Sequence, residues 1–334
     1  MTRIMSREIR MISRPNGYPT AANFELAQTE LEPLKDGQVL VRNVFMSVDP
    51  YMRGRMNAGK SYIPPFELGK ALEGGAVGEV LESRAKEFKP GDAVTSSYGW
   101  REYFVATPKE LHWVGREFHP LSVYLGALGM TGMTAWAGLN SVEIKAGDVI
   151  LVSGAAGAVG SMVGQLAKLR GCRVIGSAGS AEKVRFLQEE CGFERAFDYK
   201  AAPVLEQLKL VAPDGIDVYF DNVGGDTLEA ALTALNVRGR IIACGSISGY
   251  NEEKPRPGPS NLFNMVTKRL TMKGIMVFDW LHRQAIFEKE VGAYIKAGTV
   301  KHKETVVEGI DKASDAFIGL FQGQNVGKMV VKLA

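Results

Sequence analysis

Three glycines at a strand-to-helix junction form the clearest candidate binding motif in the chain. The segment GAAGAVG supplies them as Gly154, Gly157 and Gly160, after the apolar run AGDVILVS and before GSMVGQLAKLRG. Glycines in such a turn allow a sharp bend, close approach of the backbone to a pyrophosphate and close packing of helix on strand. The helix N-terminus adds unpaired N–H groups and a partial positive charge. The motif predicts a dinucleotide site, although its spacing departs from GxGxxG; a packing turn without a ligand is the alternative.

The second strand of this region indicates the kind of dinucleotide. Sites for NAD place Asp or Glu about 20 residues beyond the glycines, where the carboxylate accepts hydrogen bonds from the ribose. The corresponding segment, GSAGS at residues 176–180, has no carboxylate, and Lys183 and Arg185 follow it on an expected helix. Glu182 comes one turn too late for the acidic position. We therefore expect NADP(H), with Lys183 facing the 2′-phosphate; a solvated helix lysine is the alternative.

No cysteine or histidine has the spacing of a metal site or of a disulfide framework. The cysteines are expected to fill small buried spaces as apolar residues, and the histidines to be surface or structural groups. These residues are Cys172, Cys191, Cys244, His112, His119, His282 and His302. We expect no resident metal ion.

Charge and hydropathy exclude several classes of partner. The 334 residues carry 40 Lys and Arg against 37 Asp and Glu, a net charge of +3, without a dense basic block. Nucleic acid and anionic membranes are therefore not expected as partners. No apolar run approaches the roughly 20 residues that span a bilayer, and the first residues, MTRIMSREIRMISRP, lack the apolar core of a signal peptide. We expect a cytoplasmic protein of about two domains.

Two patterns of elements divide the chain. Residues 1–125 contain short Val-rich segments separated by Gly and Pro, which is typical of a barrel or sandwich. Residues 126–299 alternate strand and helix patterns, which predicts a parallel, doubly wound sheet with helices on both faces. Residues 300–334 return to a β-rich character. We expect an α/β protein in which 1–125 and 300–334 form one domain and 126–299 form a second, inserted domain.

The last elements of the alternating region bear on assembly. A strand over 271–278 comes last in the expected sheet, so it should lie at the edge, where pairing with a second copy would cover it. Helices are expected over 279–298 and over 311–323, the latter opened by an Asp311 cap. The other expected strands of the sheet are 146–154, 172–179, 195–200, 215–224 and 239–248.

Several segments taken together resemble one family. The segments AAGAVGSMVGQLAKLRGC, GSAEKV, FDNVGG, CGSISGYN and GQNVGK, with SVDPYMRGRM at 47–56, are similar to the zinc-independent medium-chain dehydrogenase/reductases. Within them the chain resembles the prostaglandin reductase and leukotriene B4 12-hydroxydehydrogenase group, with plant alkenal double-bond reductases and bacterial curcumin reductases. The resemblance implies a GroES-like catalytic domain, a Rossmann domain and a homodimer. It implies a site without zinc, since Ala71 and Leu72 stand in GKALEGGAVGEV where a zinc enzyme would need His.

The resemblance also implies which residues hold NADP(H). The helix N-terminus would meet the pyrophosphate, Lys183 and Tyr199 the 2′-phosphate, and Asn222 would lie near the cofactor. The apolar helix with Met130 and Thr134 and the loops after the fifth and sixth strands would border the nicotinamide. Asn325, near the last strand, would close the cleft. The expected contacts are Met130, Thr134, Gly157, Ala158, Val159, Gly160, Ser161, Lys183, Tyr199, Asn222, Cys244, Gly245, Ser246, Ser248, Tyr250, Ile275, Met276, Val277 and Asn325. For Tyr199 and Asn222, ordinary polar residues at strand ends are the alternative.

The implied reaction is the NADPH-dependent reduction of the carbon-carbon double bond of α,β-unsaturated ketones and aldehydes. A hydride from the nicotinamide would add to the β-carbon, and the enolate would be stabilised by hydrogen bonding and protonated at the α-carbon. The alternatives are another NADP oxidoreductase, such as a quinone reductase or a secondary-alcohol dehydrogenase, and a nucleotide-binding protein without turnover.

Two tyrosines are the candidate donors to the substrate carbonyl, because a tyrosine hydroxyl donates while it stays protonated at pH 7. Tyr62, in KSYIPPF, comes first, since a similar Ser-Tyr-x-Pro-Pro element occurs in bacterial curcumin reductases. Tyr250, in SISGYN, comes second. Plant double-bond reductases carry their proposed tyrosine in the segment matching NMVTKR, where this chain has Thr267. The alternative is that both tyrosines only shape the pocket or touch the cofactor.

The segment SVDPYMRGRM leaves two points open. Arg53 and Arg55 would either steer an acidic substrate or be solvated turn cations. Tyr51 and Met52 would either line the cleft or pack inside the barrel.

Overall fold

The computed structural model describes residues 4–254 and 256–334, and these form two compact units. The β-rich unit contains the residues up to 125 together with 304–325 and 329–334. The α/β unit contains residues 126–303 and the short segment 326–328. In this division the chain returns to the β-rich unit at Glu304, and three residues near its end belong to the α/β unit.

The α/β unit is built on a six-stranded sheet in which every neighbouring pair is parallel. The strand order is β10-β9-β8-β11-β12-β13, so the chain runs outward from β8 in one direction and then restarts beside β8 with β11. This is the order of a doubly wound dinucleotide-binding sheet, and it confirms the predicted fold class. The strands are β8 Val149–Val152, β9 Arg173–Ala178, β10 Arg195–Asp198, β11 Ile216–Asp221, β12 Leu235–Ala243 and β13 Thr271–Gly274.

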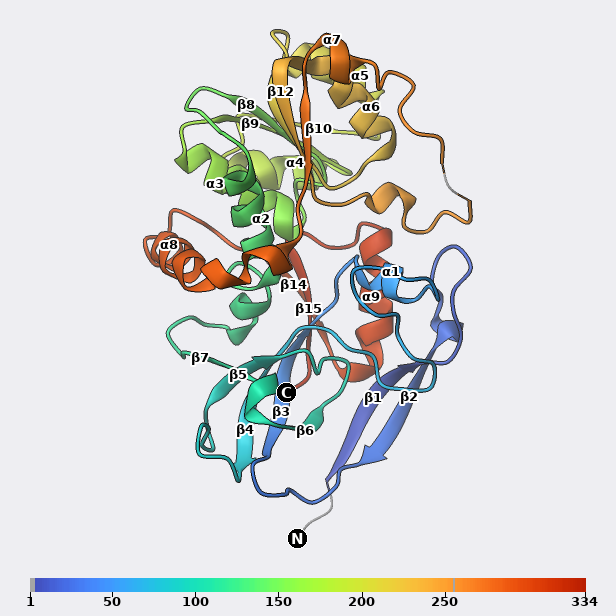
Figure 1. The fold of residues 1–334 in the computed structure, drawn as a ribbon, viewed down its shortest axis with the longest axis vertical. Coiled ribbons are helices and arrows are strands. Elements are labelled where there is room, and N and C mark those ends of the chain that lie inside the picture. The colour runs from blue at the N-terminus through green and yellow to red at the C-terminus, as the bar shows by residue number, and fades with distance from the viewer. Residues whose placement is uncertain (1–3, 255) are drawn as a thin grey trace. The chain divides into compact units, whose positions relative to one another are not determined.

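Helices cover both faces of this sheet (Figure 1). Helices α2 and α3 pack on each other over one face, and α5 and α6 pack on each other over the opposite face. Buried Leu, Ile, Phe, Tyr and Ala side chains, mainly of the strands and of α5 and α6, form one continuous core. The helical elements are α2 Met130–Ser141, α3 Ala158–Leu169, α4 Ala181–Arg185, a π-helical turn Phe186–Glu190, α5 Val204–Val211, α6 Gly225–Ala234, the 3-10 turn Ile247–Gly249, α7 Asn264–Thr267, the 3-10 turns Val277–Arg283 and α8 Gln284–Lys296.

The β-rich unit contains a seven-stranded sheet and a separate hairpin (Figure 1). The sheet follows the order β14-β15-β3-β4-β5-β7, with β6 paired to β3, and β3 pairs antiparallel with β15, β4 and β6. Its elements are β1 Met5–Met11, β2 Phe24–Glu30, β3 Val39–Ser47, α1 Met52–Arg55, β4 Ala76–Ser83, β5 Ala93–Ser96, β6 Tyr103–Ala106, β7 His112–Val114, β14 Glu304–Glu308, α9 Ala313–Phe321 and β15 Lys328–Lys332, with 3-10 turns at Ala21–Asn23, Pro108–Glu110, Leu121–Leu125 and Ile310–Lys312.

Several expected element boundaries are wrong, among them the strand expected over 239–248, which is β12 Leu235–Ala243. Strand β13 ends at Gly274 and not at residue 278, because Ile275 donates its N–H to Ala243 and the chain then turns into a 3-10 helix. The expected helix 279–298 is therefore two elements, the 3-10 turns that begin at Val277 and helix α8. Helix α9 begins at Ala313, so Asp311 lies inside the preceding 3-10 turn and does not cap the helix.

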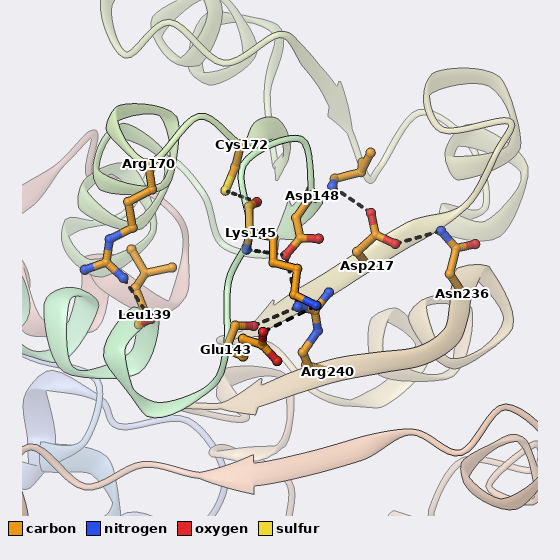
Figure 2. A network of polar contacts seen from close by, with 10 residues as sticks. Leu139, Glu143, Lys145, Asp148, Arg170, Cys172, Asp217, Asn236 and Arg240 are labelled. Carbon is orange, nitrogen blue, oxygen red and sulfur yellow. Dashed lines mark hydrogen bonds and ion pairs between the residues drawn. The ribbon is translucent and has the colours of Figure 1, made fainter.

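Polar side chains tie together the amino ends of the parallel strands (Figure 2). Asp148 accepts the backbone N–H of Lys145 at 2.9 Å and pairs with Arg240 at 3.0 Å. Asp217 accepts the backbone N–H of Val149 at 2.9 Å and the side-chain amide of Asn236 at 3.0 Å. This edge of the sheet is internally paired, which leaves the carboxyl edge as the place for a ligand.

Among the described residues, every helix is too short or too polar to cross a lipid bilayer.

Candidate functional site

The glycine turn has the local geometry that a pyrophosphate needs. Gly157 precedes helix α3 and provides no side chain to cap its first N–H groups. A Cβ on Gly160 would lie 2.6 Å from both the Cα of Ala155 and the carbonyl oxygen of Gly154, so only glycine lets the helix approach the turn this closely. The backbone of Ala158, Val159 and Gly160 therefore forms an open helix N-terminus directly after β8. Ser161 follows, buried, with its N–H bonded to the Gly157 carbonyl at 3.0 Å.

The loops that follow β11 and β12 lie against each other at the carboxyl edge. Asn222 donates its side-chain amide to the carbonyl oxygen of Ser153 at 2.7 Å and accepts the N–H of Ile247 at 3.2 Å. Ser248 donates both its N–H, at 3.2 Å, and its hydroxyl, at 2.6 Å, to the carbonyl oxygen of Val223. The structure thus brings Asn222 together with the loop that contains Cys244, Gly245, Ser246, Ser248 and Tyr250.

Tyr250 closes its own loop. Its hydroxyl oxygen accepts the backbone N–H of Ser246 at 3.3 Å, and burial is the main reason that its pKa is raised. The hydroxyl is therefore neutral over the physiological range, and its proton is free to be donated to a further acceptor. The proposed role of Tyr250 as a donor stays a prediction.

Two lysines and a tyrosine gather at the ends of β9 and β10. A Cβ on Gly179 would lie 3.0 Å from the hydroxyl of Tyr199, so the tyrosine ring stands directly over the end of β9. Lys183 lies in the first turn of α4, and its pKa is lowered by burial and then by the positive charge of Lys200. Together, the ammonium groups of Lys183 and Lys200 and the hydroxyl of Tyr199 suit a doubly charged phosphate. Lys200, whose ammonium lies 5.9 Å from the centre of the Tyr199 ring, was missed from the sequence.

The other expected contacts of this unit lie on α2 and at the end of β13. Thr134 donates its hydroxyl to the carbonyl oxygen of Met130 at 2.7 Å, so these two residues share the first turn of α2. Ile275, Met276 and Val277 follow β13 and are half-buried. The side chain of Ile275 approaches α2, since its Cδ1 would lie 3.1 Å from a Cβ on Gly138.

The segment GQNVGK places a second piece of chain against the glycine turn. Gly327 donates its N–H to the carbonyl oxygen of Ala156 at 2.7 Å, and it bridges Gly157 in parallel register. Asn325 comes two residues earlier and belongs to the β-rich unit. Its expected contact with the cofactor stays a prediction.

Tyr62 lies on a loop of the β-rich unit that is fixed at both ends. Arg14 donates to the carbonyl oxygen of Met56 at 2.8 Å and to that of Phe66 at 3.0 Å. Arg55 donates to the carbonyl oxygen of Pro64 at 2.9 Å and stacks 4.1 Å from the centre of the Phe66 ring. Between these anchors Tyr62 is 56% exposed. The pKa of nearby Tyr51 is raised by burial and then by the charge of Asp49.

The expectation that Arg53 and Arg55 are solvated turn cations is wrong. Both side chains are buried, at 3% and 6% exposure, and both bind within the unit. Arg53 donates to the carbonyl oxygen of Gly17 at 2.8 Å and to Asn57 at 2.7 Å, and Arg55 pairs with Glu73 at 2.6 Å. Both arginines therefore hold the loop in place.

Of the other open pair, Met52 packs inside the core and Tyr51 packs partly buried against it.

Comparison with known proteins extends over nearly the whole chain. The family model described as N-terminal domain of oxidoreductase matches residues 7–114, and the one described as zinc-binding dehydrogenase matches residues 158–292. The chain is 40% identical to the NADPH-dependent curcumin reductase of Escherichia coli, with 97% of this chain and 96% of the relative covered. It is 43% identical to the NADP-dependent 2-alkenal reductase of Nicotiana tabacum, with 99% and 98% covered. The crystal structure of CurA from Vibrio vulnificus in complex with NADPH superposes with a TM-score of 0.94 at 42% identity, with 98% and 99% covered.

The chain belongs to the medium-chain dehydrogenase/reductases. Its relatives are those of the curcumin, 2-alkenal and prostaglandin reductase group, and the resemblance seen in the sequence is confirmed. One matching family model is named for zinc. Within residues 4–254 and 256–334 of this medium-chain reductase, no three His, Cys, Asp or Glu side chains lie together so that they could hold a metal ion. Burial raises the pKa of the Cys172 thiol to about 11 and that of Cys191 to about 12, so both stay neutral.

A buried polar network beneath the site of this reductase was also missed. Asp221, at the end of β11, is 2% exposed, and Tyr219 and Ser153 are fully buried beside it. The sequence signal for this network was Asp221 itself, which follows an apolar strand in FDNVGG. A carboxylate that is buried there requires several hydrogen-bond donors.

Proposed function

We propose that this chain is an NADPH-dependent reductase of the carbon-carbon double bond of α,β-unsaturated ketones and aldehydes. The single observation that carries the proposal is the likeness over the whole chain to curcumin and 2-alkenal reductases at 40–43% identity. The α/β unit supports the choice of cofactor independently. Its glycine turn presents an open helix N-terminus, and Lys183, Tyr199 and Lys200 gather where an NAD enzyme would have an acid.

In the proposed reaction NADPH supplies the hydride. The residues of the chain bind, orient and polarise. The N–H groups of Ala158 and Val159 bind the pyrophosphate, and Lys183 with Tyr199 binds the 2′-phosphate. Tyr62 donates a hydrogen bond to the carbonyl oxygen of the substrate as negative charge develops there, with Tyr250 as the second candidate. The finer assignments are that the enzyme is a homodimer paired through β13 and works in the cytoplasm.

The test is the consumption of NADPH with an enone, an enal, a quinone, a saturated ketone and no substrate. The proposal expects turnover with the first two, and a product in which mass spectrometry finds two added hydrogens and an intact carbonyl group. Consumption with the quinone alone would contradict it. A parallel sample dialysed against a chelator should keep its activity; loss of activity that stoichiometric zinc restores would contradict the predicted independence from metal.

A further inference from the structure

Asp221 is a buried acid whose hydrogen bonds all end on one oxygen. Its Oδ1 accepts the Tyr219 hydroxyl at 2.7 Å, the N–H of Gly224 at 2.7 Å and the N–H of Val223 at 2.9 Å. The Ser153 hydroxyl lies 3.4 Å from the same oxygen. Among the described residues, Oδ2 accepts no hydrogen bond from the protein, and no Lys or Arg lies within ion-pair distance of the carboxylate. The negative charge of Asp221 is thus met by neutral donors only.

The same residue connects three loops at the carboxyl edge of the sheet. Through its side chain it holds the residues after β11, and its carbonyl oxygen accepts the N–H groups of Cys244 and Gly245, after β12, at 2.9 and 3.0 Å. Ser153, at the end of β8, lies 3.0 Å from the Tyr219 hydroxyl and accepts the N–H of Asn222 at 3.0 Å. The glycine turn, the loop after β11 and the loop after β12, which is proposed to border the nicotinamide, therefore depend on one network.

The charge of Asp221 reaches groups in those loops. Burial and then the Asp221 charge raise the pKa of the Cys244 thiol to about 12. The same charge is among the causes, after burial, of the raised pKa of Tyr250. An almost fully buried anion such as Asp221 is screened less than one at the surface, so its charge acts over a longer range.

We propose that Asp221 is a positioning residue whose buried charge makes the site hold the oxidised cofactor more tightly relative to the reduced one. The nicotinamide ring carries a positive charge in NADP⁺ and none in NADPH, so a nearby anion stabilises only the oxidised form. The inference rests on the proposed function, because it requires that the loops after β11 and β12 face the nicotinamide. Beyond that function, the charge of Asp221 lowers the reduction potential of the bound NADP⁺/NADPH couple and so favours transfer of the hydride to the substrate.

The experiment compares the dissociation constants of NADP⁺ and NADPH, by isothermal titration calorimetry, in wild type and two variants. Asp221→Asn keeps Oδ1, to which all the bonds go, and removes the charge. We expect the ratio of the NADP⁺ constant to the NADPH constant to rise about tenfold, which corresponds to about 1.4 kcal/mol and to about 30 mV for a two-electron couple. Tyr219→Phe is the matched control: it removes one hydrogen bond from the same oxygen and keeps the charge, so it should lower thermal stability and leave the ratio unchanged.

An unchanged ratio in a folded Asp221→Asn variant that binds both forms would overturn the inference, and so would an equal change in Tyr219→Phe. If the amide variant does not fold, Asp221→Ser serves in its place, with a smaller neutral acceptor. Failure of both to fold would also overturn the inference, because the carboxylate would then serve the fold. Wild-type protein that binds neither form of the cofactor would instead refute the proposed function.

Discussion

Gly327 and Ala156 are joined by a hydrogen bond of 2.7 Å between the N–H of the first and the carbonyl oxygen of the second. The backbone φ of Gly327 is +69°, and a Cβ there would lie 2.0 Å from the carbonyl oxygen of Lys303. The glycine turn is thus supported from outside by a residue that tolerates no side chain.

Gly327→Ala should weaken the support of the turn. The variant combines an unfavourable positive φ, worth about 1–2 kcal/mol, with a clash against a backbone atom, so we expect a lower melting temperature and a higher Kd for NADPH. Gly298→Ala is the matched control, because Gly298 has a φ of +68° with no atom within 4 Å of a Cβ. The control should lower the melting temperature through its unfavourable φ and leave the Kd for NADPH unchanged. Equal behaviour of the two variants would contradict the role given to Gly327.

Lys183→Ala should change the affinity for NADPH and not that for NADH. A charge-assisted hydrogen bond contributes roughly 1.5–3 kcal/mol, so we expect the Kd for NADPH to rise about tenfold or more. Lys209→Ala, which removes an exposed cation from α5, is the control and should leave both constants unchanged. Equal losses with NADPH and NADH in Lys183→Ala would indicate a folding defect and count against the assignment.

The affinity for NADPH should also fall at alkaline pH. Burial and the charge of Lys200 lower the pKa of Lys183, so this ammonium loses its proton, and its attraction for the phosphate, at a lower pH than a solvated lysine does. The Kd for NADPH should therefore rise with pH in the wild type and stay flatter in Lys183→Arg, since a guanidinium keeps its charge. A pH dependence that is the same for NADPH and NADH would not agree with this assignment.

Tyr62→Phe should keep the affinity for NADPH and lower turnover by about 10–1,000-fold, the range found when an acid–base or oxyanion donor is removed. Tyr103→Phe, on strand β6 of the same unit, is the control and should turn over like the wild type. The measurement is the turnover number with one enone at saturating NADPH. Wild-type turnover in Tyr62→Phe would remove Tyr62 from the mechanism, and a large loss in Tyr250→Phe alone would reverse the order of the two candidates.

Strand β13 should form the interface between two copies of the chain. All four of its residues are exposed, and it lies at the edge of the sheet beside β12. An unpaired strand edge invites pairing, and Met272→Asp would place like charges near each other across a symmetric interface. We expect the mass of a dimer by light scattering at micromolar concentration for the wild type, and a shift toward the monomer for the variant. A monomeric wild type would refute the assignment.

The parts that were predicted correctly are those fixed by local sterics and periodicity. The order of strand and helix patterns predicted the doubly wound sheet, and the spacing of Gly154, Gly157 and Gly160 predicted the turn, because each depends on neighbours in the sequence. The parts that were missed depend on tertiary partners. Arg53 looks like a surface cation until Gly17 supplies its acceptor, and Asp221 gains its role from Tyr219 and Ser153.

Strand β13 was predicted too long, again because its length depends on a tertiary partner. Ile275, Met276 and Val277 continue the apolar pattern of a strand, and the prediction places Gly274 before them inside that strand and not at its end. The ladder to β12 nevertheless ends, since the last bond goes from Ile275 to Ala243, where β12 itself ends. A strand's length is set by its partner, which the pattern of one segment does not contain.

Strand β15 lies inside the sheet of the β-rich unit, between β14 and β3, with Val330 opposite Ser47. On the ribosome, β3 is synthesised early, and its neighbour β15 is synthesised only after all six strands of the α/β unit. The α/β unit obtains all six of its strands first and can fold while synthesis continues. Completion of the β-rich sheet must therefore follow the synthesis of β15, so a ribosome that stalls after residue 303 leaves Phe45–Ser47 of β3 without this partner strand and exposed to chaperones or to aggregation.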